Sequence, residues 1–119
     1  MSTEIREAGY QTIRDFIESD WDYIELRDDD DSQVTRIQIS EDDRAEWLHA
    51  SDAQVLEVEV EVQGEDDDIP LDTTFTGSAM YDEESDGDEL SFDDFADALI
   101  GTEGDILVVT HEIEVPELE

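Results

Sequence analysis

The acidic segment Asp82–Asp93 has the spacing of a calcium-binding loop. Oxygen-bearing side chains alternate over its first five positions, Gly87 stands sixth, and an acid stands twelfth. Two details weaken the match, because Asp93 is shorter than the usual closing glutamate and Glu89 stands where an apolar residue is normal. Since 39 of the 119 residues are acidic, near-matches of this kind arise by chance. We therefore expect a solvated loop and no metal ligands, with a calcium-binding domain as a minor alternative.

The side chains of nucleophilic and acid–base catalysis do not form a recognisable set. The chain has two histidines, His49 and His111, and no cysteine. His111 falls on the apolar face of an alternating segment, where a packed or interfacial histidine is favoured over a catalytic or metal-binding one. No Gly-x-Ser-x-Gly motif occurs, and carboxylates on solvated loops lack the contrasting environments that acid–base catalysis needs. We expect no enzyme, no catalytic residues and no cofactor.

Phosphate, nucleic-acid and membrane binding are also disfavoured. Neither Gly-x-x-x-x-Gly-Lys nor Gly-x-Gly-x-x-Gly is present. The five basic residues are all arginine, and the formal net charge of -34 repels a phosphate backbone. No apolar run approaches the length of a membrane span, and residues 1–6 show no apolar signal-peptide core. We expect neither nucleic acid nor membrane as a partner.

The charge imbalance indicates the environment in which the chain folds. At 0.1 M salt the Debye length is about 10 Å, so neighbouring carboxylates repel one another and oppose the compact state. At 1 M it falls to about 3 Å, and the repulsion is nearly erased. The composition therefore predicts a protein that folds and stays soluble in molar salt, from an extreme halophile or a virus that infects one.

Disorder and DNA mimicry can each produce an acidic composition, but the sequence favours neither. Disordered acidic chains have few apolar residues, whereas 37% of this chain is apolar and those residues are periodic. A DNA mimic gathers its carboxylates on one face to imitate the phosphate spacing. Here acids interrupt every segment, which indicates solvation of the whole surface.

The apolar periodicity predicts one helix followed by strands. Residues at helical spacing predict a helix within residues 1–20: Ile5, Ala8, Thr12, Ile13, Phe16 and Ile17. The period then changes to two, and the predicted strands are Trp21–Arg27, Val34–Ile39, Trp47–His49, Val55–Gln63, Thr73–Tyr81 and Ile106–Val115. Between the last two strands, a serine cap at Ser91, apolar residues at helical spacing and Gly101 predict a short helix.

These elements predict a single domain over residues 1–119 with an α+β, mainly β fold. The N-terminal helix within residues 1–20 docks on an antiparallel β-sandwich or partly open barrel, which spans residues 21–116. That sandwich has about six strands and one short helix. A parallel sheet is disfavoured because no strand pair is joined by a long helical crossover. We expect Trp21 and Trp47 to pack in the core instead of stacking on a ligand.

Several segments resemble a known class of viral proteins. They are the opening Ile5–Gly9, then Trp21–Asp29, Ile69–Asp82 and Leu107–Pro116. Together they resemble small β-rich virion structural proteins of haloarchaeal tailed viruses and proviruses. The resemblance implies a component used in many copies, such as a capsid decoration, turret, neck or tail protein. It implies no catalytic residues.

We therefore expect a non-enzymatic virion component that assembles in high salt. Its expected partners are other virion structural proteins and copies of itself, and its expected location is the virion, assembled in the haloarchaeal cytoplasm. A cellular, cytoplasmic haloarchaeal binding or regulatory module is the alternative. Subunits so acidic can approach closely only where charge is sparse, so interfaces are expected on the N-terminal helix and around Thr73–Tyr81.

Overall fold

The computed structural model describes residues 7–49 and 55–114, in which one helix precedes seven strands. The helix α1 spans Glu7–Asp20 and ends where the sequence predicts. The strands are β1 (Tyr23–Asp28), β2 (Gln33–Gln38), β3 (Ala45–Trp47), β4 (Val55–Gln63), β5 (Thr73–Tyr81), β6 (Ser91–Ile100) and β7 (Ile106–Glu114). The helix α1 is neither long nor apolar enough to span a membrane.

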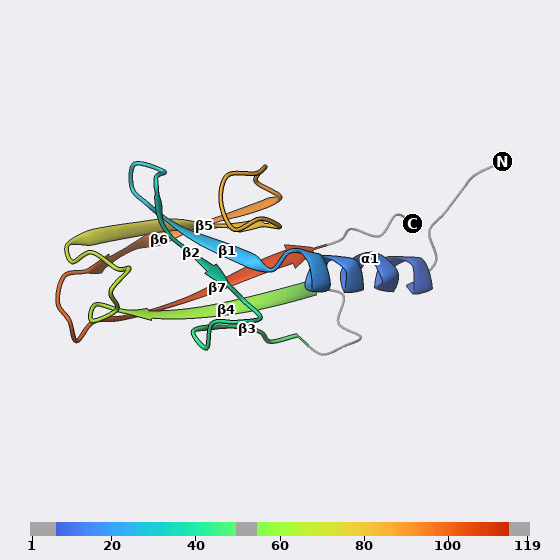
Figure 1. Ribbon diagram of the computed structural model, residues 1–119, viewed down its shortest axis with the longest axis horizontal. Helices are drawn as coiled ribbons and strands as arrows, with labels where there is room; N and C mark the ends of the chain where they lie inside the picture. The colour runs from blue at the N-terminus through green and yellow to red at the C-terminus, as the bar shows by residue number, and fades with distance from the viewer. Residues whose placement is uncertain (1–6, 50–54, 115–119) are drawn as a thin grey trace.

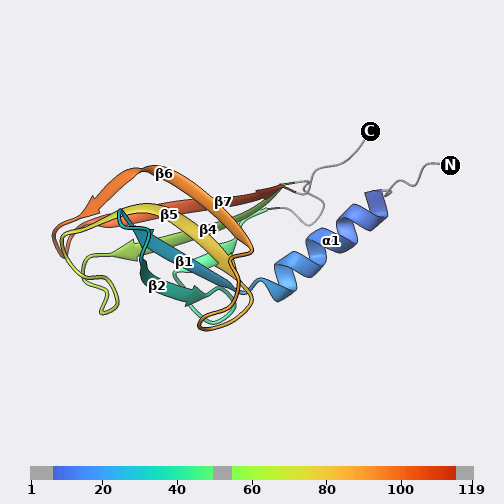
Figure 2. The same ribbon diagram turned by 90° about the horizontal axis from the view of Figure 1, so that it is seen from above.

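The strands form two antiparallel sheets that pack face to face (Figures 1 and 2). Sheet A has the strand order β2-β1-β5-β6, and sheet B has the order β3-β4-β7. Alternate residues of β4 point into the core, where Val58 and Val60 are fully buried beside Ile24, Leu26 and Phe75 of sheet A. The predicted α+β, mainly β sandwich is confirmed.

The segment 91–100 is strand β6, so the predicted short helix is wrong. It pairs with β5 from Ser91 opposite Met80 to Ile100 opposite Thr73. Phe92 and Leu99 were expected on the buried face of that helix, but in the strand both side chains are exposed. Pairing with the preceding strand overrides the local pattern, as is common for strands.

A register shift in sheet A also changes which β5 residues face the core. The pairing of β5 with β6 is irregular between Phe75 and Gly77. Because side chains alternate along a strand, such a shift exchanges faces. Phe75, Ser78 and Met80 are all fully buried, although Phe75 and Met80 differ by an odd number of positions.

The helix α1 continues the long axis of the sandwich beyond the ends of β4 and β7 (Figures 1 and 2). Its buried side chains are Tyr10, Arg14 and Ile17. The predicted stripe is therefore rotated around the helix: Ile13 and Phe16 are exposed, while Ile5 lies outside the described residues. Within residues 7–49 and 55–114, no strand covers Ile13 and Phe16.

Candidate functional site

A buried carboxylate organises the outer face of sheet A. Glu25 on β1 is only 3% exposed and accepts hydrogen bonds from Arg27 Nε at 2.8 Å and from Arg36 Nη2 at 2.9 Å. Arg27 Nη2 also donates to the Tyr81 hydroxyl at 2.6 Å. Burial opposes the charge of Arg27, but the bond to Glu25 and the charges of Tyr81 and Glu89 raise its pKa. The network is a fixed structural element, because each charge has a partner.

The acidic loop between β5 and β6 is held by the same two arginines. Arg36 Nη1 donates to the backbone carbonyls of Glu83 at 3.1 Å and Asp86 at 2.9 Å, and Arg27 Nη1 contacts Glu89 Oε1 at 3.0 Å. The two guanidinium groups therefore tie this loop to strands β1 and β2. The twelfth position, Asp93, lies within strand β6 and not in the loop.

A second arginine cluster joins two loops at the end of the sandwich. Arg44 contacts Asp42 at 2.8 Å, Asp66 at 3.2 Å and Asp68 at 2.8 Å. Its hydrogen bonds lower the pKa of Asp42 and of Asp68, and the latter also accepts from Thr35 Oγ1 at 2.7 Å. These carboxylates therefore form ion pairs that connect the two loops.

Three further carboxylates come close together at Asp28, Asp29 and Asp30, within 4.8 Å of one another. Asp28 Oδ1 accepts hydrogen bonds from the backbone N–H groups of Asp30 and Ser32, both at 3.0 Å. The cluster is thus the β1–β2 turn itself, in which an aspartate commonly stabilises its own backbone. It has no feature beyond proximity that selects an ion.

His111 lies at the centre of the sandwich and links the two sheets. Its Nδ1 is 2.7 Å from Ser78 Oγ on β5, and its Nε2 is 2.9 Å from Ser91 Oγ on β6. The side chain is fully buried, and burial lowers its pKa to about 4 against the opposing charge of Asp93. The predicted packed histidine is confirmed. Its two serine partners were not foreseen, because they come from strands far away in sequence.

The other histidine connects the helix to sheet B. His49 Nδ1 lies 3.2 Å from the backbone nitrogen of Glu57, and its Nε2 lies 3.1 Å from Glu18 Oε1 of α1. The Trp47 ring packs edge-on against it, with centroids 5.5 Å apart. Both Trp21 and Trp47 are partly buried against the core, in agreement with the prediction.

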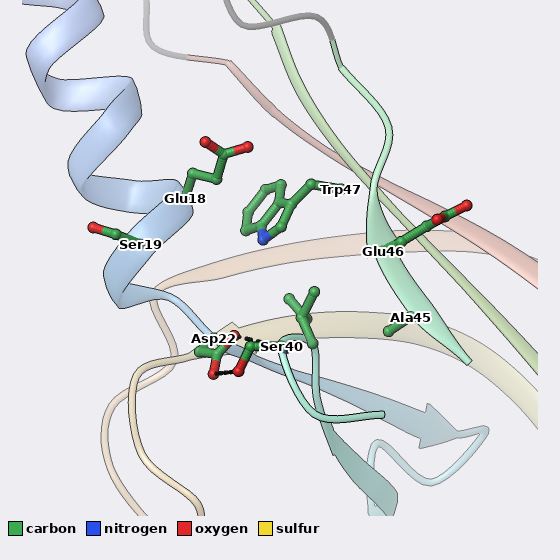
Figure 3. Close-up of a pocket in the computed structure, with 8 residues that line it drawn as sticks. Glu18, Ser19, Asp22, Ser40, Ala45, Glu46 and Trp47 are labelled. Atoms are coloured by element: carbon green, nitrogen blue, oxygen red, sulfur yellow. Dashed lines mark hydrogen bonds between the residues drawn. The ribbon is translucent and has the colours of Figure 1, made fainter. Parts of the chain in front are cut away.

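A shallow cavity of about 380 Å³ lies at the base of α1 (Figure 3). Figure 3 shows the Trp47 ring facing the helix across this space, with Glu18 beside it and Asp22 below. Asp22 already accepts hydrogen bonds from the backbone and hydroxyl of Ser40, as well as from Gln38 at 3.0 Å. With Glu18 bound to His49, two of the three lining carboxylates are engaged by the fold.

Part of the surface of α1 is uncharged, although Asp15, Glu18 and Asp20 are exposed on the same helix. Gly9, Thr12, Ile13 and Phe16 are spaced as one helix face, which we call the α1 strip. Ile13 is 38% exposed and Phe16 is 57% exposed, and none of the four residues is charged. Thr12 Oγ1 donates to the carbonyl of Ala8 at 2.9 Å, so its hydroxyl is satisfied within the helix. The strip is therefore an uncharged patch with two exposed apolar side chains.

The α1 strip is one of the two regions in which the sequence predicts an interface. The other, Thr73–Tyr81, is β5, which lies between β1 and β6 and is mostly buried. That part of the prediction is wrong. The strand β5 lacks charged residues because most of it is buried within the sandwich. Low charge in a sequence marks buried strands as well as interfaces.

Exposed apolar side chains also occur at the other end of the sandwich. Leu99, Ile106 and Val108 are each more than half exposed. Val108 stands directly opposite Glu61 of β4, whose outward residues are mainly acids. This surface mixes apolar side chains with carboxylates, whereas the α1 strip does not.

Comparison of the chain with protein-family models, with curated proteins and with solved structures finds no match.

Proposed function

We propose that this chain is a non-enzymatic structural protein that assembles in multiple copies in molar salt. The assembly that we propose is a haloarchaeal tailed-virus particle, in which the chain is a capsid decoration, turret, neck or tail protein. The observation that carries the assembly proposal is the α1 strip: an uncharged, partly apolar helix face on a chain with net charge -34.

The distribution of charge supports assembly through a charge-free surface. All four arginines of the described residues bond to groups of their own chain, so few cations remain to attract an acidic neighbour. Two such subunits repel each other wherever their acidic faces approach. Close contact is favourable where carboxylates are absent and salt screens the remainder.

The chemistry-bearing groups support a structural role. The serine–histidine contact at His111 is sealed in the core, where Ser78 is also fully buried. At the cavity beside α1, Asp22 and Glu18 are held by Ser40, Gln38 and His49. These groups brace the fold and are not poised to act on a bound molecule.

Sedimentation equilibrium in KCl above about 1 M, where the Debye length is about 3 Å, tests assembly. We expect a defined oligomer, and we expect the chain to be present in purified virus particles when these are examined by mass spectrometry. Portal, protease and major capsid genes beside its own gene support the virion proposal. A strict monomer throughout molar salt, with the chain missing from purified particles, contradicts the proposed function.

A further inference from the structure

The α1 strip has a size pattern that suits one particular partner. Along the helix it presents glycine, threonine, isoleucine and phenylalanine at positions 9, 12, 13 and 16. Gly9 has no side chain, so it leaves room for a bulky group of a partner to approach the helix. A bulky side chain two turns away, Phe16, is the matching projection.

We propose that two copies of this chain pair through their α1 strips in antiparallel orientation. With the two-fold axis between Thr12 and Ile13, Gly9 of one copy lies opposite Phe16 of the other, and Thr12 lies opposite Ile13. Each phenylalanine then fills the space over a glycine, and the same residues serve both copies, as an isologous interface requires. The inference rests on the proposed function, because it names the partner at the proposed interface.

Charge favours a second copy over a basic partner. A basic protein binds this chain best through its carboxylates, and the α1 strip has none. The α1 strip of a second copy is also uncharged, so the two strips can pack together without burying a charge. On this chain the other exposed apolar residues on β7 stand beside acids such as Glu61, so they are poorer partners for α1.

The shape of the molecule favours the antiparallel orientation. The helix α1 extends along the long axis beyond β4 and β7, so antiparallel pairing places the two sandwiches at opposite ends (Figures 1 and 2). A helix of 14 residues is about 21 Å long, which exceeds the Debye length of about 3 Å at 1 M salt. A parallel pair would bring both acidic sandwiches side by side.

The first test compares Phe16→Ala with Leu99→Ala in molar KCl. Leu99 is at least as exposed as Phe16 but lies on β6, so it is a matched control. We expect Phe16→Ala to raise the dimer dissociation constant by roughly 10- to 100-fold, because two side chains lose their burial. Leu99→Ala leaves the constant unchanged. Equal effects of the two substitutions, or no effect of Phe16→Ala, overturn the inference.

The second test uses the lack of cysteine to read the orientation. Under mild oxidation, Ile13→Cys alone is expected to cross-link, as is an equal mixture of Gly9→Cys and Phe16→Cys. Phe16→Cys alone and Asp15→Cys are expected not to cross-link, and circular dichroism in the same salt verifies that each variant is folded. Cross-linking of Phe16→Cys with itself indicates a parallel pair and overturns the orientation.

These outcomes separate the inference from the proposed function. An oligomer that survives Phe16→Ala unchanged shows that assembly uses another surface, so the inference fails while assembly stands. A strictly monomeric unmodified chain, missing from purified particles, contradicts the proposed function itself. A dimer that dissociates on Phe16→Ala supports both.

Discussion

Protonation of His111 should destabilise the fold, and replacing this residue with glutamine should remove the effect. The imidazole is fully buried and bonded to Ser78 and Ser91, so a charge there loses its solvation, and the charge of Asp93 offsets only part of that loss. Burial lowers its pKa from 6.5 to about 4 in the folded protein. Glutamine retains hydrogen-bonding groups but does not titrate.

The sign and size follow from that pKa difference. Between pH 6.5 and 4 the unfolded chain binds a proton at this histidine while the folded chain does not. Acidification through that window therefore favours unfolding, with a total effect of about 3 kcal/mol that is complete near pH 4. At pH 7 and above the penalty is absent.

The assay is the free energy of unfolding, measured by denaturant titration at several pH values in constant molar KCl. The many carboxylates also titrate near pH 4, so the informative quantity is the difference between the unmodified chain and His111→Gln. That difference should change by about 3 kcal/mol from pH 7.5 to 4. Val109→Ala, a buried change on the same strand that removes no titratable group, is the matched control and should retain the slope of the unmodified chain. Identical slopes for His111→Gln and the unmodified chain refute the reasoning.

Three further predictions concern the rest of the fold. Glu25→Gln should cost about 3 kcal/mol of unfolding free energy, because a buried ion-pair network loses its central charge. Gly64→Ala should cost about 2 kcal/mol or more, because the new Cβ would lie 1.9 Å from the Thr102 carbonyl oxygen. Calcium at micromolar to millimolar concentration should produce no saturable shift in the Asp82–Asp93 amides, since Arg36 already holds loop carbonyls.

Each of these predictions has its own control and contrary result. The exposed Glu61→Gln should change stability by less than about 0.5 kcal/mol, and an equal loss in both glutamate variants argues against the Glu25 network. Gly104→Ala meets no atom within 4 Å, so it should be nearly neutral, and parity with Gly64→Ala contradicts the steric argument. Saturable amide shifts confined to the acidic loop contradict the calcium prediction.

Sequence periodicity predicts elements that have one face in the protein core and the other in water. In β4, valines alternate with glutamates because one face is buried and the other is hydrated, so both strand and orientation were predictable. The segment at 91–100 has apolar residues at helical spacing, but its pairing with β5 makes it a strand. Such pairing is non-local and leaves little mark on the segment itself.

The same limit applies to the side-chain networks. The sequence placed His111 on an apolar face, but Ser78 and Ser91 reach it from two other strands. Glu25 and Arg36 likewise meet across β1 and β2, where the local sequence shows only charged residues among many. In α1 the predicted stripe included Phe16, because a helix period does not show which side of an apolar arc is covered.

The most direct test of the central claim is the mass of the unmodified chain and of Phe16→Ala by sedimentation equilibrium in KCl above about 1 M, where charge is screened. We predict that the unmodified chain sediments at twice the mass of one chain or a larger multiple. Phe16→Ala should shift this equilibrium strongly toward smaller species while remaining folded. A monomeric mass for the unmodified chain at every such salt concentration contradicts assembly through the α1 strip.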